Sequence, residues 1–418
     1  MKTLIVIGYV WPEPASSAAG SRMLQILAPF ISADYRVIFA SPADESAHAP
    51  ELSQHGIESQ AILLNSSTFD DWIREIQPDV VMFDRFMMEE QFGWRVEAAC
   101  PDALRVLDME DAHSLRHARH QAVKQGREVT SADWQSDMAF REIAAILRCD
   151  VSLVISEYEM DWLTSQFPVR PEKLLYLPFM YTPEQGGHIG TEQAFQQRSH
   201  FVSIGNFRHE PNWDAVLQLS QLWPRIRKRL PDAELHIYGA YPPPKATQLH
   251  NPKTGFLVKG WADDAATVIR SARVMLAPLR FGAGLKGKLA EAACCGTPAV
   301  TTPTGAEGMY GNAVPVRVAA SDDSFIEAAV ALYSDSEQWQ FLSSAGPEAV
   351  IERFNEAQHQ RRLIDGIHGL IDGLERHRSE DFIGGMLRHH SMKSTRYMSQ
   401  WIEAKNRLRD ISAKNEDN

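Results

Sequence analysis

The sequence has few cysteines, no long apolar run and no excess of basic residues. Its four cysteines show no metal-ligand spacing, and the adjacent Cys294 and Cys295 are a poor disulfide pair. No apolar stretch reaches the roughly 18 residues of a membrane span. The apolar run at residues 4–7 is too short for a signal peptide and no small-residue cleavage site follows it. We therefore expect reduced thiols and a cytoplasmic location.

Acidic residues outnumber basic ones, and the formal net charge is -12. A nucleic-acid partner would require a dense basic face, so we expect none. The same charge repels anionic membranes on average, although a local basic patch would still allow peripheral contact. The apolar fraction of 44% is that of an ordinary globular protein, and 418 residues exceed what one core usually serves. Two domains are therefore expected.

Short apolar runs alternate with longer amphipathic stretches, which is typical of α/β proteins. Strands are predicted in the first half at residues 3–7, 35–40, 79–83, 104–107, 151–156 and 174–177. A second series follows at residues 201–204, 234–238, 256–259, 274–277, 299–302 and 314–318. The polar segment 180–199 is predicted to be a linker between domains. We predict two Rossmann-like domains facing each other across a cleft, at residues 1–185 and 199–370. Residues 371–418 are predicted to form a helical and polar tail, in which residues 386–418 are either a helix crossing the domains or a solvated end.

The most informative stretch is residues 277–300, where a buried strand is followed by a glycine-rich turn and a helix. The helix is predicted to begin near Leu285 and to end at Gly296. Free N–H groups and the positive end of the helix dipole make such a turn an anion site. Lys286 and Lys288 add two charges suited to a diphosphate, although basic residues there oppose the dipole. Glu291, three residues after Lys288, lies on the same helix face and is suited to a ribose diol.

This stretch, APLRFGAGLKGKLAEAACCGTPAV, resembles the donor-site motif of the family 4 (group 1) glycosyltransferases, in the subset with a GAGLKGK turn before the glutamate. The segments FVSIGNFRHEPNWDAVLQL, LPDAELHIYGAYP, GWADD and TTPTGAEGM are similar to that family in order and spacing. Weaker similarity occurs at AAGSRM, DVVMFDRF, VLDMEDAHSLR and ISEYE. The resemblance implies a GT-B fold, a nucleotide-sugar donor with a UDP-sugar slightly favoured, no cofactor, no obligatory metal and retention of anomeric configuration.

The resemblance also implies roles for individual residues. His113, Lys288 and Glu291 are the expected catalytic residues, with Glu291 on the ribose and Lys288 on the diphosphate. The expected donor site consists of Gly205, Asn206, Arg208, Trp261, Gly282, Ala283, Gly284, Leu285, Lys286, Lys288, Glu291 and Glu307.

The sequence departs from the family pattern at two places. Ala283 stands where many members carry the first of two glutamates, so recognition of the donor sugar is altered. Asn206 and Asn212 stand near the positions of a usual arginine and lysine. We expect Lys286 and Lys288 to neutralise the phosphates instead, together with Arg208 or His209.

The acceptor is expected on the N-terminal side of the cleft, near the loop at residues 9–22. Its candidate residues are Trp11, Gly20, Arg22 and Asp84, because ligands bind at the carboxyl ends of parallel strands. For Asp84, the sequence predicts a structural ion pair with Arg85 as readily as a role in acceptor binding. Histidines 113, 117 and 120 share a helix face, but that face is expected to be solvated, and no metal is predicted. Gly8 begins no G-x-G-x-x-G motif, so a nicotinamide enzyme is not expected.

The function predicted from the sequence is a metal-independent retaining hexosyltransferase. Its acceptor hydroxyl belongs to a glycan, a lipid-linked molecule or another compound. Two alternatives remain open. A nucleotide-sugar epimerase on the same fold would use cleft groups such as Asp84, Asp111, His113 and Glu307. The second alternative is a catalytically silent partner subunit, in which the loss of the family's glutamate at Ala283 would be tolerated.

Overall fold

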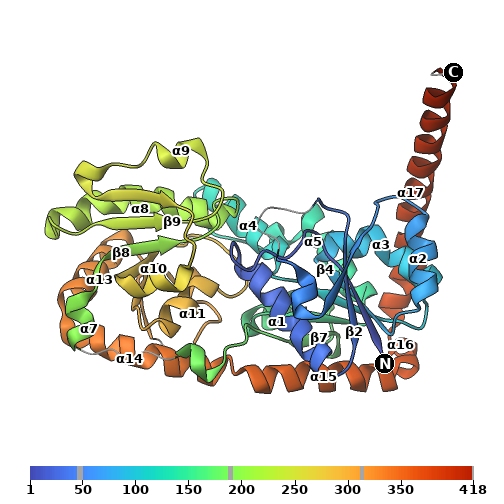
Figure 1. Ribbon diagram of the computed structural model, residues 1–418, viewed down its shortest axis with the longest axis horizontal. Coiled ribbons are helices and arrows are strands. Elements are labelled where there is room, and N and C mark those ends of the chain that lie inside the picture. The colour runs from blue at the N-terminus through green and yellow to red at the C-terminus, as the bar shows by residue number, and fades with distance from the viewer. Residues whose placement is uncertain (45–49, 187–191, 311–314, 417–418) are drawn as a thin grey trace.

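The chain folds into two parallel α/β domains in a computed structural model, which describes residues 1–44, 50–186, 192–310 and 315–416 (Figure 1). Within the described residues, no helix has both the length and the apolar character needed to cross a bilayer.

The N-terminal domain contains a seven-stranded parallel sheet of order β3-β2-β1-β4-β5-β6-β7. Its strands are β1 (Thr3–Ile7), β2 (Arg36–Ser41), β3 (Ile57–Ala61), β4 (Val80–Asp84), β5 (Leu104–Asp108), β6 (Val151–Val154) and β7 (Leu174–Tyr176). Its helices are α1 (Ala18–Ser32), α2 (Thr68–Ile76), α3 (Phe86–Ala99), α4 (His113–Lys124), α5 (Asp137–Arg148) and α6 (Glu157–Gln166).

The C-terminal domain contains a six-stranded parallel sheet of order β10-β9-β8-β11-β12-β13. Its strands are β8 (Ser199–Ile204), β9 (Leu235–Tyr238), β10 (Phe256–Gly260), β11 (Ala272–Ala277), β12 (Ala299–Thr301) and β13 (Val316–Val318). Its helices are α7 (Glu192–Gln197), α8 (Glu210–Arg229), α9 (Pro244–Thr247), α10 (Ala265–Ser271), α11 (Gly287–Cys294), α12 (Pro303–Ala306), α13 (Asp322–Ser334) and α14 (Ser336–Arg353).

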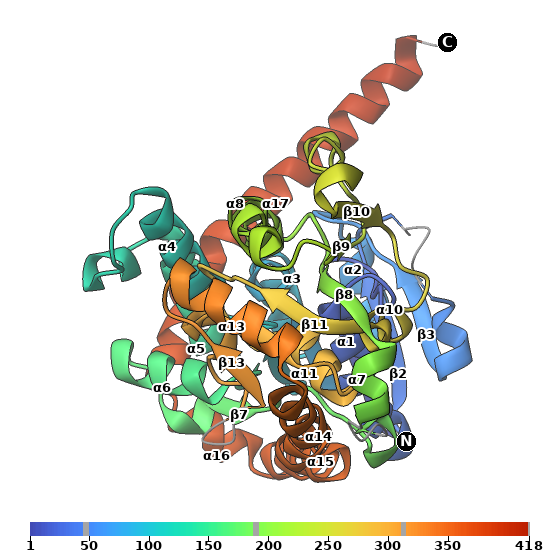
Figure 2. The same cartoon turned by 90° about the vertical axis from the view of Figure 1, so that its left-hand side faces the viewer.

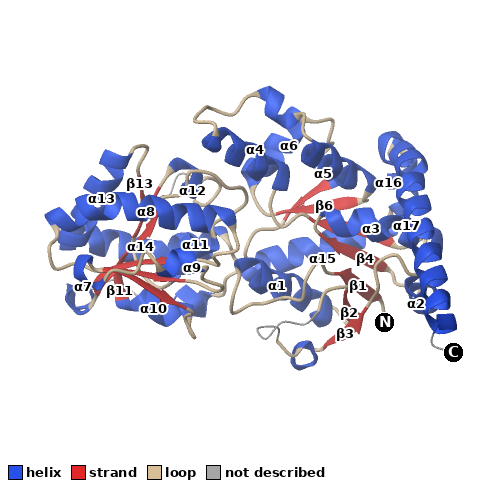
Figure 3. Cartoon of the chain, turned by 90° about the horizontal axis from the view of Figure 1, so that it is seen from above, coloured by secondary structure: helices blue, strands red, loops and turns tan. Residues whose placement is uncertain are grey.

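Each sheet lies between layers of helices, as the red strands between blue helices show (Figure 3). The central strands are apolar throughout because both of their faces are covered; Leu4 to Ile7 of β1 are fully buried. All the predicted strands are present, although Val314 lies outside the described residues. Strand β3 was not predicted, because the sequence of this edge strand is IESQA and only its first residue is buried.

The two sheets reverse their strand order at equivalent places, between β1 and β4 and between β8 and β11. Ligands of open α/β sheets bind at such switch points, outside the carboxyl ends of the strands. The loops that follow β1, β4, β5, β8 and β11 therefore form the natural place for a site in this molecule.

Two crossings connect the domains, and they run side by side. The backbone N–H of Tyr181 donates to the carbonyl of Phe354 at 2.8 Å, and the N–H of Glu356 donates back to Tyr181 at 3.1 Å. The predicted linker at residues 180–199 contains the helix α7, and residues 187–191 lie outside the described part of the chain.

After the second crossing the chain returns to the N-terminal domain. Helix α15 (Glu356–Asp372) packs along α1, and its Leu363 and Ile367 are fully buried in the N-terminal core. The chain therefore leaves the C-terminal domain before the predicted boundary at residue 370. Helices α16 (Leu374–Ser379) and α17 (Phe382–Glu416) follow, and α17 packs against α3 and α5 before it continues beyond the body of the molecule (Figure 1).

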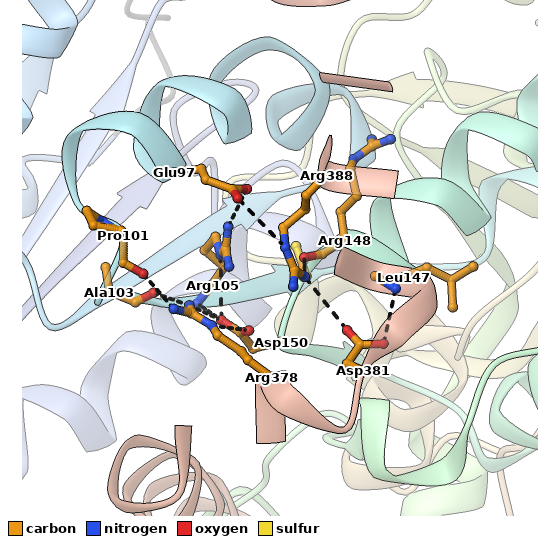
Figure 4. Close-up of polar contacts among 12 residues, drawn as sticks. Glu97, Pro101, Ala103, Arg105, Leu147, Arg148, Asp150, Arg378, Asp381 and Arg388 are labelled. Atoms are coloured by element: carbon orange, nitrogen blue, oxygen red, sulfur yellow. Dashed lines mark hydrogen bonds and ion pairs between the residues drawn. The ribbon is translucent and has the colours of Figure 1, made fainter. Parts of the chain in front are cut away.

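Ion pairs fix this C-terminal segment to the amino-terminal end of the N-terminal sheet (Figure 4). The guanidinium of Arg378 binds the buried carboxylate of Asp150 at 2.7 Å. Lys173 and Asp381 form a buried pair at 2.6 Å. Arg388, in the first turns of α17, donates to the carbonyl of Arg148 at 3.0 Å. The first part of the C-terminal segment therefore belongs to the N-terminal domain.

Candidate functional site

A cavity of about 630 Å³ lies between the two domains, at the carboxyl ends of both sheets. Loops after β1, β4 and β5 line it from one side, and loops after β8 and β11 with the first turns of α11 line it from the other. Most predicted site residues line this cavity: Arg22, His113, Gly205, Asn206, Arg208, Trp261, Gly282, Ala283, Gly284, Leu285, Lys286, Lys288 and Glu291.

Lys288 connects the start of α11 to the loop after β8. Its Nζ donates a hydrogen bond of 2.8 Å to Oδ1 of Asn212. The Nδ2 of Asn212 in turn donates to the carbonyl of Asn206 at 3.0 Å. A Cβ at Gly205 would lie 2.7 Å from the Asn212 side chain and 2.8 Å from the Lys288 ammonium. A side chain at position 205 would displace one of these two groups, and the predicted donor-site residues Gly205 and Lys288 do lie together.

The ionisable groups of α11 are held in a poorly hydrated place. Burial lowers the pKa of Lys288 to about 8, although neighbouring Glu291 favours its charged form. Burial also raises the pKa of Glu291, and Lys288 opposes that rise. An anion that replaces the missing hydration of Lys288 would therefore be bound strongly.

Lys286 is turned back onto the glycine loop, by which we mean residues 281–286. Its Nζ donates to the carbonyl of Gly284 at 2.7 Å and to that of Ala283 at 3.2 Å. Burial lowers the pKa of Lys286. Gly284 has φ +62°, which favours glycine. In this arrangement the ammonium of Lys286 stabilises the loop, whereas the side chain of Lys288 lines the cavity and can bind an anion there.

The altered position 283 is packed against the N-terminal domain. Ala283 is buried and belongs to an apolar cluster of that domain. The next residue, Gly284, abuts Asp111, because a Cβ at Gly284 would lie 2.8 Å from the Cβ of Asp111. Asp111 itself lines the cavity. A carboxylate from the N-terminal domain therefore lies beside the loop position where the resemblance places a missing glutamate.

Asp111 belongs to a compact polar group with His113. The carboxylate pairs with Arg116, and the Oδ1 of Asp111 lies 3.3 Å from the Nδ1 of His113. That Nδ1 donates to the carbonyl of Asp111 at 3.0 Å, since a carbonyl can only accept. Burial lowers the pKa of His113 to about 4, so its ring is neutral at pH 7. The pKa of Asp111 lies below its ordinary value, because Arg116 and the histidines outweigh burial.

Two buried carboxylates support this group, and the sequence analysis identified neither. Glu142 of α5 accepts from the backbone N–H groups of His113 and Ser114 at 2.8 and 2.9 Å. Glu159 of α6 accepts from the N–H of Ala112 at 2.8 Å and from the N–H of Gly284 at 2.7 Å. Glu159 thus connects the N-terminal domain directly to the glycine loop. Burial raises the pKa of both glutamates to about 7.

Glu307 is not among the residues that line the cavity. Its carboxylate forms two 2.8 Å bonds to the guanidinium of Arg119, which also donates to the carbonyl of Gly282 at 2.8 Å. Glu307 therefore contacts the glycine loop through Arg119. The glycines beside it lie close to protein: a Cβ at Gly308 would lie 2.6 Å from the Ser156 hydroxyl.

The predicted acceptor residues divide between two places. Trp11, Gly20 and Asp84 line a smaller hollow beside the cavity, which shares Arg85 and Arg208 with it. Arg22 lines the main cavity, but it is fully buried and donates to Asp108 at 2.6 Å.

An acidic cluster lies at this hollow, which two of its members, Asp84 and Glu110, line. Carboxylate oxygens of Asp84, Asp108 and Glu110 all lie within 4.8 Å of one another. Burial and the neighbouring Asp108 raise the pKa of Glu110 to about 8. The guanidinium groups of Arg22 and Arg85 lower the pKa values of Glu110 and Asp84, but they do not offset the effect of burial. The Asp84–Arg85 pair, left open by the sequence, is present at 3.8 Å.

The remaining candidates surround the cavity mouth. The guanidinium of Arg208 lies 3.6 Å from the ring centroid of Tyr241. The Nε1 of Trp261 donates to Asp263 at 3.0 Å, which orients the indole at the cavity wall. His120, expected at the surface, instead stacks on Phe281 of the glycine loop with 4.2 Å between ring centroids.

Comparisons with known proteins agree with this architecture. Residues 198–335 match the family model of the group 1 glycosyl transferases. Among curated proteins, no sequence matches the chain. The structure is similar to sucrose-phosphate synthase (tll1590) from Thermosynechococcus elongatus, with 14% identity and a TM-score of 0.65, covering 89% of this chain and 100% of that one.

Two further solved structures share the fold. Anabaena Alr3699/HepE in complex with UDP-glucose has 12% identity and a TM-score of 0.66, with 88% of this chain and 100% of that one covered. WaaG, a glycosyltransferase involved in lipopolysaccharide biosynthesis, has 14% identity and a TM-score of 0.58, with 87% and 98% covered. The predicted GT-B fold is confirmed, and the C-terminal domain matches the glycosyltransferase family.

Proposed function

We propose that the protein is a glycosyltransferase that moves a hexose from a UDP-sugar to an acceptor hydroxyl. The observation that carries the proposal is the contact between Lys288 and Asn212, which joins the first turns of α11 and α8 beside the two loops expected to hold a diphosphate. Both loops lie within the residues that match the family model. The solved relative that holds UDP-glucose supports a uridine nucleotide.

In this proposal the nucleotide occupies the C-terminal side of the cavity. The diphosphate lies between the loop at Gly205 and the start of α11, the ribose binds Glu291, and the base lies near Trp261. As the glycosidic bond breaks, negative charge develops on the leaving diphosphate. Lys288 and the positive end of the α11 helix dipole are already in place to stabilise that charge. A metal cation is then not required to neutralise the diphosphate.

The sugar would lie toward the N-terminal domain, beside Asp111 and His113. We infer that Asp111 supplies the carboxylate that Ala283 does not, because it abuts Gly284 and lines the cavity. The neutral ring of His113 would contact a sugar hydroxyl. We propose retention of configuration, as the resemblance to the group 1 glycosyltransferases implies, with the leaving phosphate taking the proton of the acceptor hydroxyl. The acceptor, of a glycan or lipid-linked kind, would enter past Trp11 and Asp84.

Product analysis with UDP-glucose and UDP-N-acetylglucosamine tests the proposal. A transferase releases UDP much faster once a suitable acceptor is present, and it leaves the sugar of the remaining donor unchanged. Conversion of the donor sugar to its epimer without acceptor would establish the epimerase alternative. Binding of UDP with no turnover across a panel of acceptors would favour the silent partner subunit.

The four cysteines are free and buried, which is consistent with a reducing compartment such as the cytoplasm.

A further inference from the structure

Helix α17 presents one apolar stripe to solvent along most of its length. Its members, with their exposed fractions, are Ile383 (39%), Met386 (44%), Tyr397 (64%), Trp401 (60%) and Leu408 (67%). At 100° per residue, these five positions fall within about 60° of one another around the helix axis, and two further exposed apolar residues of α17, Phe382 (81%) and Met398 (58%), lie to either side of them. Large apolar side chains gathered on one exposed face indicate an interaction surface.

The stripe faces away from the protein. The opposite side of the helix contains buried Gly384 and Ser399 and packs against α3 and α5. Figures 1 and 3 show α17 at the end of the molecule farthest from the C-terminal domain, and Figure 2 shows it continuing past the body. The ion pairs of Arg378, Asp381 and Arg388 hold its first turns in place. The surface is therefore formed before any partner binds, so little ordering entropy opposes binding.

Basic residues flank the stripe. Residues 382–409 contain six lysines and arginines and one acidic residue, in a chain whose net charge is -12. Lys393, Arg396, Lys405 and Arg409 are exposed, and the ammonium of Lys405 lies 5.2 Å from the ring centroid of Trp401. The acidic residue, Glu403, faces the body and accepts from the backbone N–H of Ser67 at 3.0 Å. The outward face is thus aromatic and cationic.

We propose that this face docks α17 flat in the headgroup region of an anionic membrane. Tyrosine and tryptophan side chains prefer the bilayer interface, and each nearby lysine or arginine gains about 1 kcal/mol from anionic lipid. An apolar stripe with basic flanks is the pattern of helices that lie in that interface. A second copy of the chain fits less well, because two such helices would place their basic flanks against each other.

Vesicle co-sedimentation of the full chain tests the proposal. The wild type should bind vesicles of phosphatidylglycerol and phosphatidylcholine, bind phosphatidylcholine alone at least tenfold more weakly, and be released by high salt. The double substitutions Tyr397→Ser with Trp401→Ser, and Lys393→Glu with Lys405→Glu, should each weaken binding at least tenfold. Phe341→Ser is the matched control, since Phe341 is 70% exposed on α14 of the other domain.

The altered side chains are exposed, so the variants should unfold at the wild-type temperature and bind UDP as the wild type does. The proposal is overturned if the wild type does not bind anionic vesicles, or if both double variants bind them as strongly as the wild type does. A wild-type dimer that Trp401→Ser converts to a monomer would assign the face to a second copy instead. Because vesicle binding needs no nucleotide, its failure would leave the proposed transferase activity untouched.

Discussion

The carboxylate of Glu159, in the N-terminal domain, accepts a 2.7 Å hydrogen bond from the backbone N–H of Gly284 in the glycine loop. The same oxygen accepts from Ala112, next to the Asp111–His113 group. One buried side chain thus positions both the sugar side and the phosphate side of the proposed site.

Glu159 should make stability depend on pH. Burial raises its pKa from 4.5 to about 7 in the folded protein. The folded state then binds more protons than the unfolded chain between these values, so Glu159 lowers stability as pH rises from about 5 to 7, by at most about 3 kcal/mol. Glu159→Gln removes this group. The difference in melting temperature between variant and wild type should therefore shift in favour of the variant across that range. A difference that stays constant from pH 5 to 8 would contradict the assignment.

Nucleotide affinity should fall at alkaline pH because of Lys288. The charged ammonium binds the diphosphate, and its pKa in the free protein is about 8. Above that pH, binding requires uptake of a proton, so the dissociation constant for UDP should rise by up to about tenfold per pH unit. Calorimetry in two buffers of different ionisation enthalpy would detect the proton uptake. With Lys288→Met, both the uptake and the pH dependence should disappear; their persistence would locate the titrating group elsewhere.

Asp111→Asn should separate sugar recognition from nucleotide recognition. A hydrogen bond to a charged group contributes about 1.5 to 3 kcal/mol, so UDP-sugar affinity or turnover should fall about tenfold or more. Affinity for UDP alone should change less than about threefold. Arg116→Met is the control, because it breaks the same ion pair but keeps the carboxylate. Equal losses in the two variants would show that the ion pair matters, and not the carboxylate.

Arg378→Met should destabilise the N-terminal domain. It leaves the buried carboxylate of Asp150 without its 2.7 Å partner, and breaking a buried pair costs about 3 kcal/mol or more. The exposed pair of Arg225 with Asp323 provides the comparison, and Arg225→Met should cost less than about 1 kcal/mol. Denaturant unfolding measures both. Equal stabilities of the two variants would mean that the tail is not fixed to the domain as described.

Local sequence patterns were enough to predict the glycine loop and every strand except β3. The turn before Lys288 and the glycine after the helix are neighbours in the chain, and their chemistry follows from helix geometry. Gly296 does have φ +59°, just after α11. The expected proximity of Gly205 to Lys288 came from the resemblance to the group 1 glycosyltransferases.

Contacts between distant segments were not predictable from such patterns. Glu159 lies 125 residues before Gly284, and nothing in ISEYE marks its carboxylate as a partner for that loop. Glu307 was expected in the donor site, but its carboxylate pairs with Arg119, it is not among the residues that line the cavity, and the neighbouring Gly308 lies against Ser156. The return of α15 to the first domain depends on Leu363 and Ile367 filling that domain's core. Such packing is decided by the whole fold.

The central claim is that Lys288 and Glu291 form a nucleoside-diphosphate site, and isothermal titration of the protein with UDP tests it most directly. The wild type should bind one UDP, and Lys288→Ala and Glu291→Ala should each raise the dissociation constant about tenfold or more. Arg225→Ala, far from the cavity, should bind as the wild type does. The account is contradicted if the wild type binds no UDP, or if both site variants bind it with unchanged affinity.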